Sequence, residues 1–526
     1  MYVSDKDLRQ RLLTILEAMP QFGSYEGRNN LLRNLPSHLV VTIPRSSTTS
    51  SDLVSIVDAC LEAQSNPGEP HPIGILLATA RGHARGVQRT QLERLISELR
   101  PGLVPQIPSP PCPYPGMRPF RPEQAEVFYG RDRERQQLVD RLLLRKQTLL
   151  LIVGPSGSGK SSLVLAGLLP ELEQAHPGLW QVAILRPGAQ PTKTISDLFH
   201  VNTIGSSGAI AEYLAKHNER KRLLLVVDQL EEIFTLLPRD KRGRDEQQRF
   251  VTTLLALRSS GNCAIILTLR ADFYGDLMSS ELWSFVKADD ALVEIAPLRR
   301  QDLKEVIQQP AHNVGVLAQD ALVERLVDEA EGEPGSLPLL QETLRLLWDE
   351  MSGLTLTVEA YEQLGERYSK LSRHNIGQAS AQGEFSGLAA AVALKGDEAL
   401  QVLRREHGES SELLVRRIFL RLVQFGEGRP NTRRRQPLTE LQAAGDDPEL
   451  FEQTLKVLTA KGLITLSGGE DTNGKLVDLA HEALIESWPV LQGWLVERSE
   501  SVQYTQHTLL RMPQACSSSL YYVPCI

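Results

Sequence analysis

The sequence predicts a multidomain protein with an α/β core, an all-α bundle before it and further helical units after it. Between about 123 and 298, short apolar runs alternate with amphipathic helical segments. This alternation is typical of a parallel sheet covered by helices on both faces. Residues 437–498 follow a helix–helix–hairpin–helix order that is typical of a winged-helix unit. The length of 526 residues is enough for about three or four domains.

The composition excludes several classes of protein. A hydrophobic content of 41% and a charged content of 23% are those of a soluble globular protein. The formal net charge of −8 argues against a general nucleic-acid binder. The five cysteines form no CxxC pair, which favours a reducing cytoplasm over a disulfide scaffold or structural zinc. We find no secretion signal, and the longest apolar runs are strand-sized, so we expect a cytoplasmic protein without membrane segments.

The first 100 residues are predicted to form the all-α bundle. Apolar residues at helical spacing predict helices near 4–19, 27–34, 52–63, 72–84 and 89–99. No constellation of catalytic type occurs there, so we interpret this bundle as a binding unit.

Prolines crowd the segment 101–122. Proline lacks a backbone donor and favours extended geometry, so this segment is predicted to be a semi-rigid linker between domains.

The α/β core is assigned to residues 123–298. The apolar runs predict strands at Thr148–Val153, Gln181–Leu185, Leu223–Val227, Ala264–Leu269 and Leu292–Ile295. A helical domain at 299–360 follows, and then a connector at 361–436 in which residues 372–410 show no clear pattern. The winged-helix-like unit at 437–498 precedes an irregular tail at 499–526 without any repeat.

The segment after the first predicted strand matches the phosphate-loop pattern GxxxxGK[ST] and is followed by a predicted helix. Its glycines let the backbone amides curl around phosphate oxygens, and the helix directs its positive end at the same anion. We expect Lys160 to bridge the terminal phosphates and the Ser161 hydroxyl to ligate Mg²⁺. The predicted nucleotide-binding residues are Gly154, Pro155, Ser156, Gly157, Ser158, Gly159, Lys160, Ser161 and Ser162.

A second apolar strand ends in an acid, Asp228, which we predict to hold Mg²⁺ through water. Two glutamates follow closely. One of them is expected to orient or deprotonate the attacking water, with Glu232 as the first choice and Glu231 as the second. The other is then an ordinary solvated residue at a helix start.

A third strand ends in a threonine and Arg270. If this strand lies between the phosphate-loop strand and the Asp228 strand, Arg270 faces the terminal phosphate and can report its presence. The alternative is a surface arginine paired with Asp272.

These pieces belong to an ordered series of motifs. They are CPYPGMRPF, VFYGRDRE, GPSGSGKSS, VVDQLEEIF, LTLRADF, APLRRQDL, EGEPGSLPLLQ and LAHEALIESWP, spread across roughly 112–495. In this series the chain resembles the novel STAND branch of P-loop NTPases, the signal transduction ATPases with numerous domains found largely in bacteria. The resemblance implies a five-stranded parallel sheet, a helical lid at 299–360 and a winged helix folded over the nucleotide.

The same resemblance implies further site residues. Phe128, Tyr129, Gly130 and Arg131 would lie near the base and ribose, and Pro338 would contact the adenine from the lid. His481 stands where related switch proteins place a winged-helix histidine against the diphosphate. From the sequence alone, His481 is equally a core or helix-capping histidine.

The N-terminal bundle resembles the effector-associated domains of bacterial signalling systems, which are death-fold-like and pair with a like domain on another protein. Relatives usually continue into a sensor of WD-type or helical repeats. The tail at 499–526 departs from this pattern, as expected of a truncated or frame-shifted end.

The resulting hypothesis is a cytoplasmic ATPase with slow turnover, switched by ATP or ADP together with Mg²⁺. ATP binding would drive self-association, and the clustered bundles would recruit an effector protein that carries a matching helical domain. ATP rather than GTP follows from the resemblance only.

Two alternatives remain open at this point. One is a DNA-associated winged-helix ATPase, for which Arg433, Arg434 and Arg435 form a short basic run; a solvated loop is the simpler interpretation of that run. The other is an adaptor that binds nucleotide without hydrolysing it.

Overall fold

The computed structural model describes residues 5–63, 70–84, 86–99, 103–105, 110–199, 213–214, 221–238, 240–259, 261–333, 335–351, 354–375, 387–425, 430–467 and 475–498. The chain divides into two compact units. The first contains Met1–Glu366 and Ser386–Ala391, and the second contains Arg367–Phe385 and Val392–Ile526. Each unit is described by itself below.

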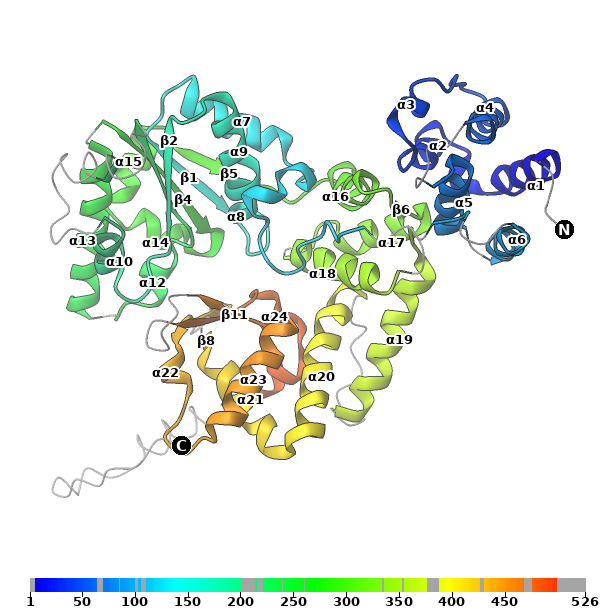
Figure 1. The fold of residues 1–526 in the computed structure, drawn as a ribbon. Coiled ribbons are helices and arrows are strands. Elements are labelled where there is room, and N and C mark those ends of the chain that lie inside the picture. The colour runs from blue at the N-terminus through cyan, green and yellow to red at the C-terminus, as the bar shows by residue number, and fades with distance from the viewer. Residues whose placement is uncertain are drawn as a thin grey trace. The chain divides into compact units, whose positions relative to one another are not determined.

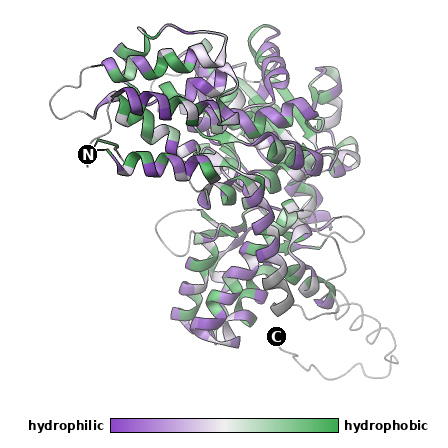
Figure 2. Ribbon diagram, turned by 90° about the vertical axis from the view of Figure 1, so that its right-hand side faces the viewer, coloured by the Kyte–Doolittle hydropathy of each residue, from purple (hydrophilic) through white to green (hydrophobic). Residues whose placement is uncertain are grey.

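The N-terminal part of the first unit is the predicted helical bundle (Figure 1). Its helices are α1 (Asp5–Glu17), α2 (Tyr25–Leu32), α3 (Ser37–Val40), α4 (Thr49–Glu62), α5 (Pro72–His83) and α6 (Gly86–Ser97). Apolar side chains from all six of these helices meet in one buried cluster, which includes Leu12, Ile56 and Leu76. Hydrophobic and hydrophilic residues alternate along these helices in Figure 2, as amphipathic packing requires.

A buried ion pair joins α2 to α4. Arg28 and Asp52 are both fully buried, and Arg28 Nε donates to Asp52 Oδ2 at 2.7 Å. Arg45 Nε and the Ser46 amide each donate to the other carboxylate oxygen, both at 2.9 Å. The carboxylate is therefore satisfied on both oxygens, as a buried charge must be.

The core of the first unit is a five-stranded parallel sheet in the order β2-β3-β4-β1-β5. The strands are β1 (Leu149–Gly154), β2 (Trp180–Leu185), β3 (Arg222–Val227), β4 (Cys263–Arg270) and β5 (Leu292–Glu294). All five predicted strands are confirmed, with ends that differ by no more than one residue. As the sequence argument about Arg270 requires, β4 lies between β1 and β3.

Alternate residues of each strand enter two separate cores, one on each face of the sheet. Leu149 and Leu151 pack with helices α10 (Pro191–Phe199), α13 (Lys241–Ser259), α14 (Tyr274–Met278) and α15 (Leu282–Ala288). Leu150 and Ile152 pack with α7 (Asp132–Leu143) and with the helical segment after the phosphate loop. Figure 1 shows these two groups of helices on opposite sides of the sheet.

The segment 299–366 of the first unit is mainly helical, as predicted. It contains α16 (Arg300–Asn313), β6 (Leu317–Ala318), α17 (Asp320–Ala330), α18 (Ser336–Asp349), β7 (Thr355–Leu356) and the start of α19 (Val358–Asn375). The short strands β6 and β7 pair in parallel.

The proline-rich segment differs from the predicted spacer in its second half. Tyr114 is buried at 2% exposure, and its hydroxyl donates to the Ile307 carbonyl of α16 at 2.5 Å. Trp348 of α18 packs edge-on against Tyr114 and donates to the Pro110 carbonyl. Two aromatic anchors thus hold residues 110–122 on the helices of 299–366, which a proline count cannot show.

The second unit contains the predicted helix–helix–hairpin–helix order. Its elements are α20 (Gly387–His407) from Val392 onward, α21 (Glu409–Arg421), β8 (Val423–Gln424), β9 (Thr432–Arg433), β10 (Gln436–Pro437), α22 (Leu438–Leu441), α23 (Pro448–Ala460), β11 (Ile464–Ser467), β12 (Leu476–Leu479) and α24 (Ala483–Ser487). Strands β10, β12 and β11 form an antiparallel sheet. The unpatterned region of the connector contains α20, and the tail 499–526 lies outside the described residues.

Within the described parts of the chain, no helix combines the length and the apolar character that a membrane crossing needs.

Candidate functional site

The carboxyl edge of the parallel sheet brings the predicted site residues together. In the strand register, Arg270 at the end of β4 lies opposite Gly154, where the phosphate loop begins. Thr268 lies two residues before Arg270 on β4. Because Val227 at the end of β3 pairs with Leu267, Thr268 lies next to Asp228. The topology thus places both motifs at one edge of the sheet, where α/β proteins bind their ligands.

The phosphate loop has the curled backbone that its glycines predict. Gly157 and Gly159 have φ angles of 71° and 88°, a region that side chains rarely adopt. The Lys160 ammonium turns back into the loop and donates to the carbonyls of Gly154 and Pro155 at 2.9 and 2.7 Å. Its charge therefore lies within the curve of the loop, where a phosphate tail would lie.

Ser161 and Asp228 are in direct contact, as the two motifs together predict. The Ser161 hydroxyl donates to Asp228 Oδ1 at 2.7 Å, although the residues are far apart in the sequence. Asp228 is 7% exposed, so a charged carboxylate here requires partners.

Two neighbouring strands supply those partners. Thr268 Oγ1 donates to Asp228 Oδ1 at 2.8 Å and accepts from the Gln229 amide at 2.9 Å. Arg186, directly after β2, places its Nε 3.3 Å from Asp228 Oδ2. Gln229 has a φ of 61°, so the chain turns sharply after Asp228.

The donor set suits a divalent magnesium ion. A hydroxyl and a carboxylate oxygen are hard ligands, and Mg²⁺ in nucleotide sites takes few protein carboxylates together with phosphate oxygens. Among the described residues, no group of three or more His, Cys, Asp or Glu side chains is arranged to hold a metal ion. The pair Ser161 and Asp228 offers one hydroxyl and one carboxylate, which leaves coordination positions for the phosphate oxygens of a nucleotide.

The two candidate glutamates point to different places on this edge. Glu231 is 7% exposed, and its Oε2 accepts from the Arg270 amide at 3.2 Å, next to the phosphate-loop strand. Glu232 is half-buried, and its Oε2 accepts from the Gly188 amide at 2.8 Å, on the loop after β2. Glu231 thus lies on the side of β4 and β1, and Glu232 on the side of β2.

Arg270 is buried, with 4% of its surface exposed. Its guanidinium donates to Asp272 Oδ2 through Nη2 at 2.5 Å and through Nε at 3.1 Å. The pairing with Asp272 that the sequence left open is therefore present, with Arg270 buried and Asp272 exposed.

Residues 128–131 border the phosphate loop and the helix after it. The Phe128 ring packs beside Gly167, and Arg131, which is 4% exposed, donates to the Ser158 carbonyl at 3.0 Å. Tyr129 accepts through its hydroxyl from Asn313 at 2.6 Å, and Gly130 lies against α16. Arg131 thus braces the loop itself, which the sequence did not predict.

The start of α18 closes over the phosphate loop. Gly335, with a φ of 80°, precedes α18, and a side chain at Gly157 would come within 2.8 Å of its Cα and 3.1 Å of Pro338. The cavity between the loop and this segment, lined in part by Arg131, Ser158 and Gly335, has a volume of about 20 Å³. A water molecule fits such a space.

Two predicted features lie in the second unit. His481 Nδ1 accepts from the Ala483 amide at 3.1 Å, which is a helix-capping contact at the start of α24. Its predicted approach to the diphosphate would join the two units and stays a prediction. In the basic run, Arg433 and Arg435 lie 3.6 and 3.9 Å from Asp478, so part of that charge is directed inward.

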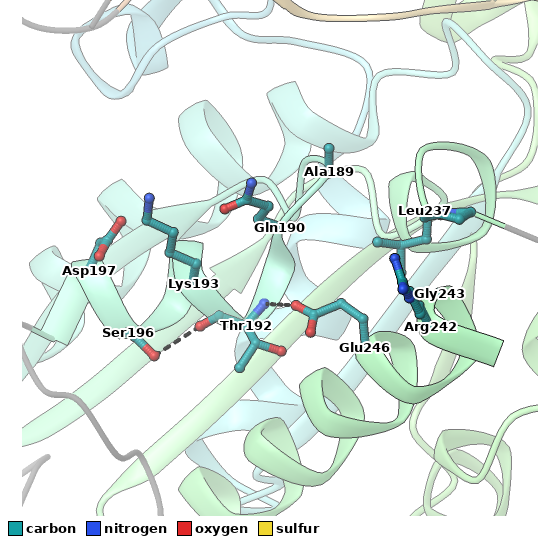
Figure 3. A pocket seen from close by; sticks show the side chains of 11 residues that line it. Ala189, Gln190, Thr192, Lys193, Ser196, Asp197, Leu237, Arg242, Gly243 and Glu246 are labelled. Carbon is teal, nitrogen blue, oxygen red and sulfur yellow. Dashed lines mark hydrogen bonds between the residues drawn. The ribbon is translucent and has the colours of Figure 1, made fainter. Parts of the chain in front are cut away.

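A larger cavity of about 1000 Å³ opens on the core between α10 and α13. Figure 3 shows Glu246 of α13 directed at the amide of Thr192 in the first turn of α10, a contact of 3.0 Å. The helix terminus is thus already paired with a carboxylate, and the polar side chains around it are largely exposed.

Sequence reasoning missed Arg186 and the brace from Arg131. Arg186 directly follows a predicted strand, so the rule that parallel strands end at one edge could have identified it.

Comparisons with known proteins point to one family. The sequence model of Novel STAND NTPase 1 matches residues 113–509, and that of effector-associated domain 2 matches residues 13–72. No curated protein matches the chain significantly.

Several solved structures show a weak overall likeness. The ORC1 protein of Aeropyrum pernix in complex with DNA is 16% identical at a TM-score of 0.37, and the match covers 69% of this chain and 94% of that one. The ORC2 protein of the same organism is 15% identical at a TM-score of 0.35, with coverages of 70% and 95%. CDC6p from Pyrobaculum aerophilum is 12% identical at a TM-score of 0.31, with coverages of 70% and 94%.

Proposed function

Because the chain belongs to the Novel STAND NTPase 1 family and carries an N-terminal effector-associated domain, we propose that it is a nucleotide-switched signalling ATPase. In this proposal, ATP binding drives self-association, and the clustered N-terminal bundles recruit an effector protein. The observation that carries the proposal is the contact of 2.7 Å between Ser161 and Asp228 beneath the curled phosphate loop. These two groups are the ones that a magnesium–nucleotide complex needs on the protein side.

The phosphates of ATP or ADP would be held by the amides of Gly157–Ser161 and by the Lys160 ammonium. Lys160 would exchange its present contacts with the loop carbonyls for phosphate oxygens. Bound Mg²⁺ would neutralise charge on the phosphates during transfer of the terminal one. Ser161 and Asp228 are the residues that would hold it.

Glu231 is the better candidate for orienting the attacking water. It is buried, and its carboxylate accepts from the amide of Arg270, the residue that lies opposite Gly154 at the start of the phosphate loop. Glu232 binds the Gly188 amide instead and supports the loop after β2. We therefore assign the water-orienting role to Glu231 and a supporting role to Glu232.

The switch itself would depend on the added phosphate of ATP. A change from mostly inactive to mostly active requires a preference of about 10,000-fold, or about 5.5 kcal/mol. Charge-assisted contacts of one phosphate with Lys160 and with an Arg270 released from Asp272 would supply much of this. The close approach of the start of α18 to the phosphate loop supports a closed resting state, in which nucleotide access would need that segment to move.

The proposal is tested by the size of the full chain in sedimentation velocity with ADP or ATP and Mg²⁺. We expect ATP to produce a larger assembly than ADP in the wild type. Lys160→Ala should remove this difference, since it removes the only charge that the phosphate loop itself contributes to the nucleotide.

Lys287→Ala, which replaces an exposed lysine on α15, serves as the matched control and should assemble like the wild type. Assembly that is the same in ATP and ADP would contradict the switch. Assembly in ATP without any phosphate release would instead favour the adaptor that does not hydrolyse its nucleotide.

A further inference from the structure

Arg186 is a charged side chain beside Asp228 that the nucleotide site, as described so far, does not use. In the sheet register, Leu185 at the end of β2 pairs with Val227 at the end of β3. The next residues, Arg186 and Asp228, therefore emerge side by side at the carboxyl edge. Arg186 Nε lies 3.3 Å from Asp228 Oδ2, with the two side chains 24% and 10% exposed.

The contacts of the Asp228 carboxylate are divided between its two oxygens. Oδ1 accepts from the hydroxyls of Ser161 and Thr268, and Oδ2 faces Arg186. The hydroxyls lie on the side of the phosphate loop and β4, whereas the guanidinium lies on the side of β2. A cation thus already neutralises the carboxylate that the magnesium site would use.

The loop that carries Arg186 is fixed at two further points. The Gly188 amide donates to Glu232 Oε2 at 2.8 Å, and Thr194 Oγ1 donates to the Pro187 carbonyl at 3.0 Å. Arg186 is therefore held near Asp228 by the fold. Glu232 therefore has a structural role, because it fixes the loop that carries Arg186.

We propose that Arg186 is a positioning residue that holds Asp228 through Oδ2 and competes with the divalent cation for the charge of that carboxylate. The proposal rests on the proposed nucleotide site. A divalent ion held by Ser161 and Asp228 brings a second positive charge to a carboxylate that is already paired. Because like charges a few ångströms apart repel, Arg186 lowers the affinity of the site for the metal.

The functional consequence concerns when the metal binds. With Arg186 present, Asp228 alone is a weak ligand for free Mg²⁺, and the ion is held chiefly when phosphate oxygens join it. Arg186 thereby couples metal binding to nucleotide binding. In the absence of metal, it stabilises a carboxylate that would otherwise be buried without a cation.

The test is a Mg²⁺ titration of the binding of fluorescent ADP to the full chain, starting in EDTA. Arg186→Gln should lower the Mg²⁺ concentration that gives half of the full effect, by about tenfold. Arg186→Lys keeps the charge and should shift it much less. Arg258→Gln is the control: Arg258 also pairs with an aspartate, Asp289, has a similar exposure of 20%, and lies by Thr148 at the opposite edge of the sheet.

A second readout does not depend on nucleotide. In EDTA, Arg186→Gln should lower the thermal unfolding midpoint, and Mg²⁺ alone should raise that midpoint more than it does in the wild type. A merely structural arginine would also lower the midpoint in EDTA, but its loss would not make the protein more responsive to Mg²⁺.

An unchanged or higher half-effect concentration of Mg²⁺ in Arg186→Gln would overturn the proposal. A wild-type chain that binds no nucleotide at any Mg²⁺ concentration would contradict the proposed function instead. In that case, the response of the unfolding midpoint to Mg²⁺ alone still tests whether Arg186 weakens Mg²⁺ binding at Asp228.

Discussion

At the scale of single residues, Asp228 joins three strands of the sheet through one carboxylate. Ser161 follows β1, Thr268 belongs to β4 and Arg186 follows β2, and each of them contacts Asp228. The position of Asp228 beside Ser161 could be predicted from the two motifs, because both follow strands of one parallel sheet. The roles of Glu231 and Glu232 could not be predicted, because their directions depend on the sharp turn at Gln229.

The directions of these two glutamates lead to a prediction about hydrolysis. Glu231→Gln should slow phosphate release about 100-fold or more, because it removes the carboxylate next to the phosphate-loop strand. Glu232→Gln should slow it much less, since the Gly188 amide can still donate to the amide oxygen that replaces the carboxylate. Phosphate release from the full chain under single-turnover conditions measures both, and the reverse order of the two variants would contradict the assignment.

At the scale of elements, the buried pair of Arg28 and Asp52 joins α2 to α4. Burial alone would raise the pKa of the Asp52 carboxyl, but hydrogen bonds from Arg45, Arg28 and the Ser46 amide lower that pKa far below its usual range. A carboxyl whose pKa is lowered by folding stabilises the folded state above its unfolded pKa of about 3.9. This contribution is lost as the pH falls below that value.

Asp52→Asn should therefore destabilise the bundle by about 3–5 kcal/mol at neutral pH, because the buried Arg28 loses its carboxylate. Hydrogen exchange of peptides from α2 and α4 in the full chain measures the effect. The difference from the wild type should be constant between about pH 5 and pH 8 and should shrink below about pH 4.

Asp58→Asn on the same helix is the control, because Asp58 pairs with Arg9 at the surface, where both side chains are more than one third exposed. It should destabilise the bundle far less than Asp52→Asn does, because water screens an exposed ion pair. Equal effects of the two substitutions would show that the buried pair does not hold α2 on α4.

The segment before α18 leads to a prediction about nucleotide entry. Gly335 holds a φ of 80°, and an alanine there disfavours the closed conformation by about 1–2 kcal/mol. Gly335→Ala should therefore raise the association rate of fluorescent ADP by about five- to thirtyfold, as measured by stopped flow.

Gly332→Ala provides the comparison. Gly332 has a similar φ of 78°, but no atom lies within 4 Å of the position of an added Cβ. We expect a smaller change in the association rate for this variant. A rate that is unchanged or lower in Gly335→Ala would mean that the segment does not limit entry.

Most elements of the core could be predicted, and the failures have physical causes. The strands of the sheet are apolar runs with clear ends, so their positions depend little on the rest of the fold. The packing of residues 110–122 depends on contacts of Tyr114 with α16 and α18, which are far away in the sequence. The helix α20 is rich in alanine and carries little periodic pattern, although helix propensity alone favours it.

At the scale of the whole molecule, the chain combines an effector-associated bundle, an NTPase core with its helical extension and a second unit with helices and small sheets. The order of these parts along the chain was predictable from the motifs. The proposed switch includes a change in the second unit when nucleotide binds. The predicted role of His481 at the diphosphate belongs to that response.

In the proposed switch, nucleotide binding in the NTPase core changes what the N-terminal bundle can bind. We expect that a chain without residues 1–100 still assembles in ATP, because the nucleotide site lies entirely in later residues, but no longer captures a protein with a matching helical domain. Sedimentation velocity and a pull-down measure the two properties separately. Loss of ATP-dependent assembly on this deletion would place the self-association surface in the bundle.

The central claim is that the loop of Gly154–Ser161, opposite Asp228, holds the phosphates of an adenine nucleotide together with Mg²⁺. Equilibrium binding of ADP and ATP to the full chain, measured by calorimetry with and without Mg²⁺, tests it most directly. The account predicts binding that is strengthened by Mg²⁺ and is weakened at least tenfold in both Lys160→Ala and Asp228→Asn. Binding that is absent in the wild type, or unaffected by both substitutions, would contradict it.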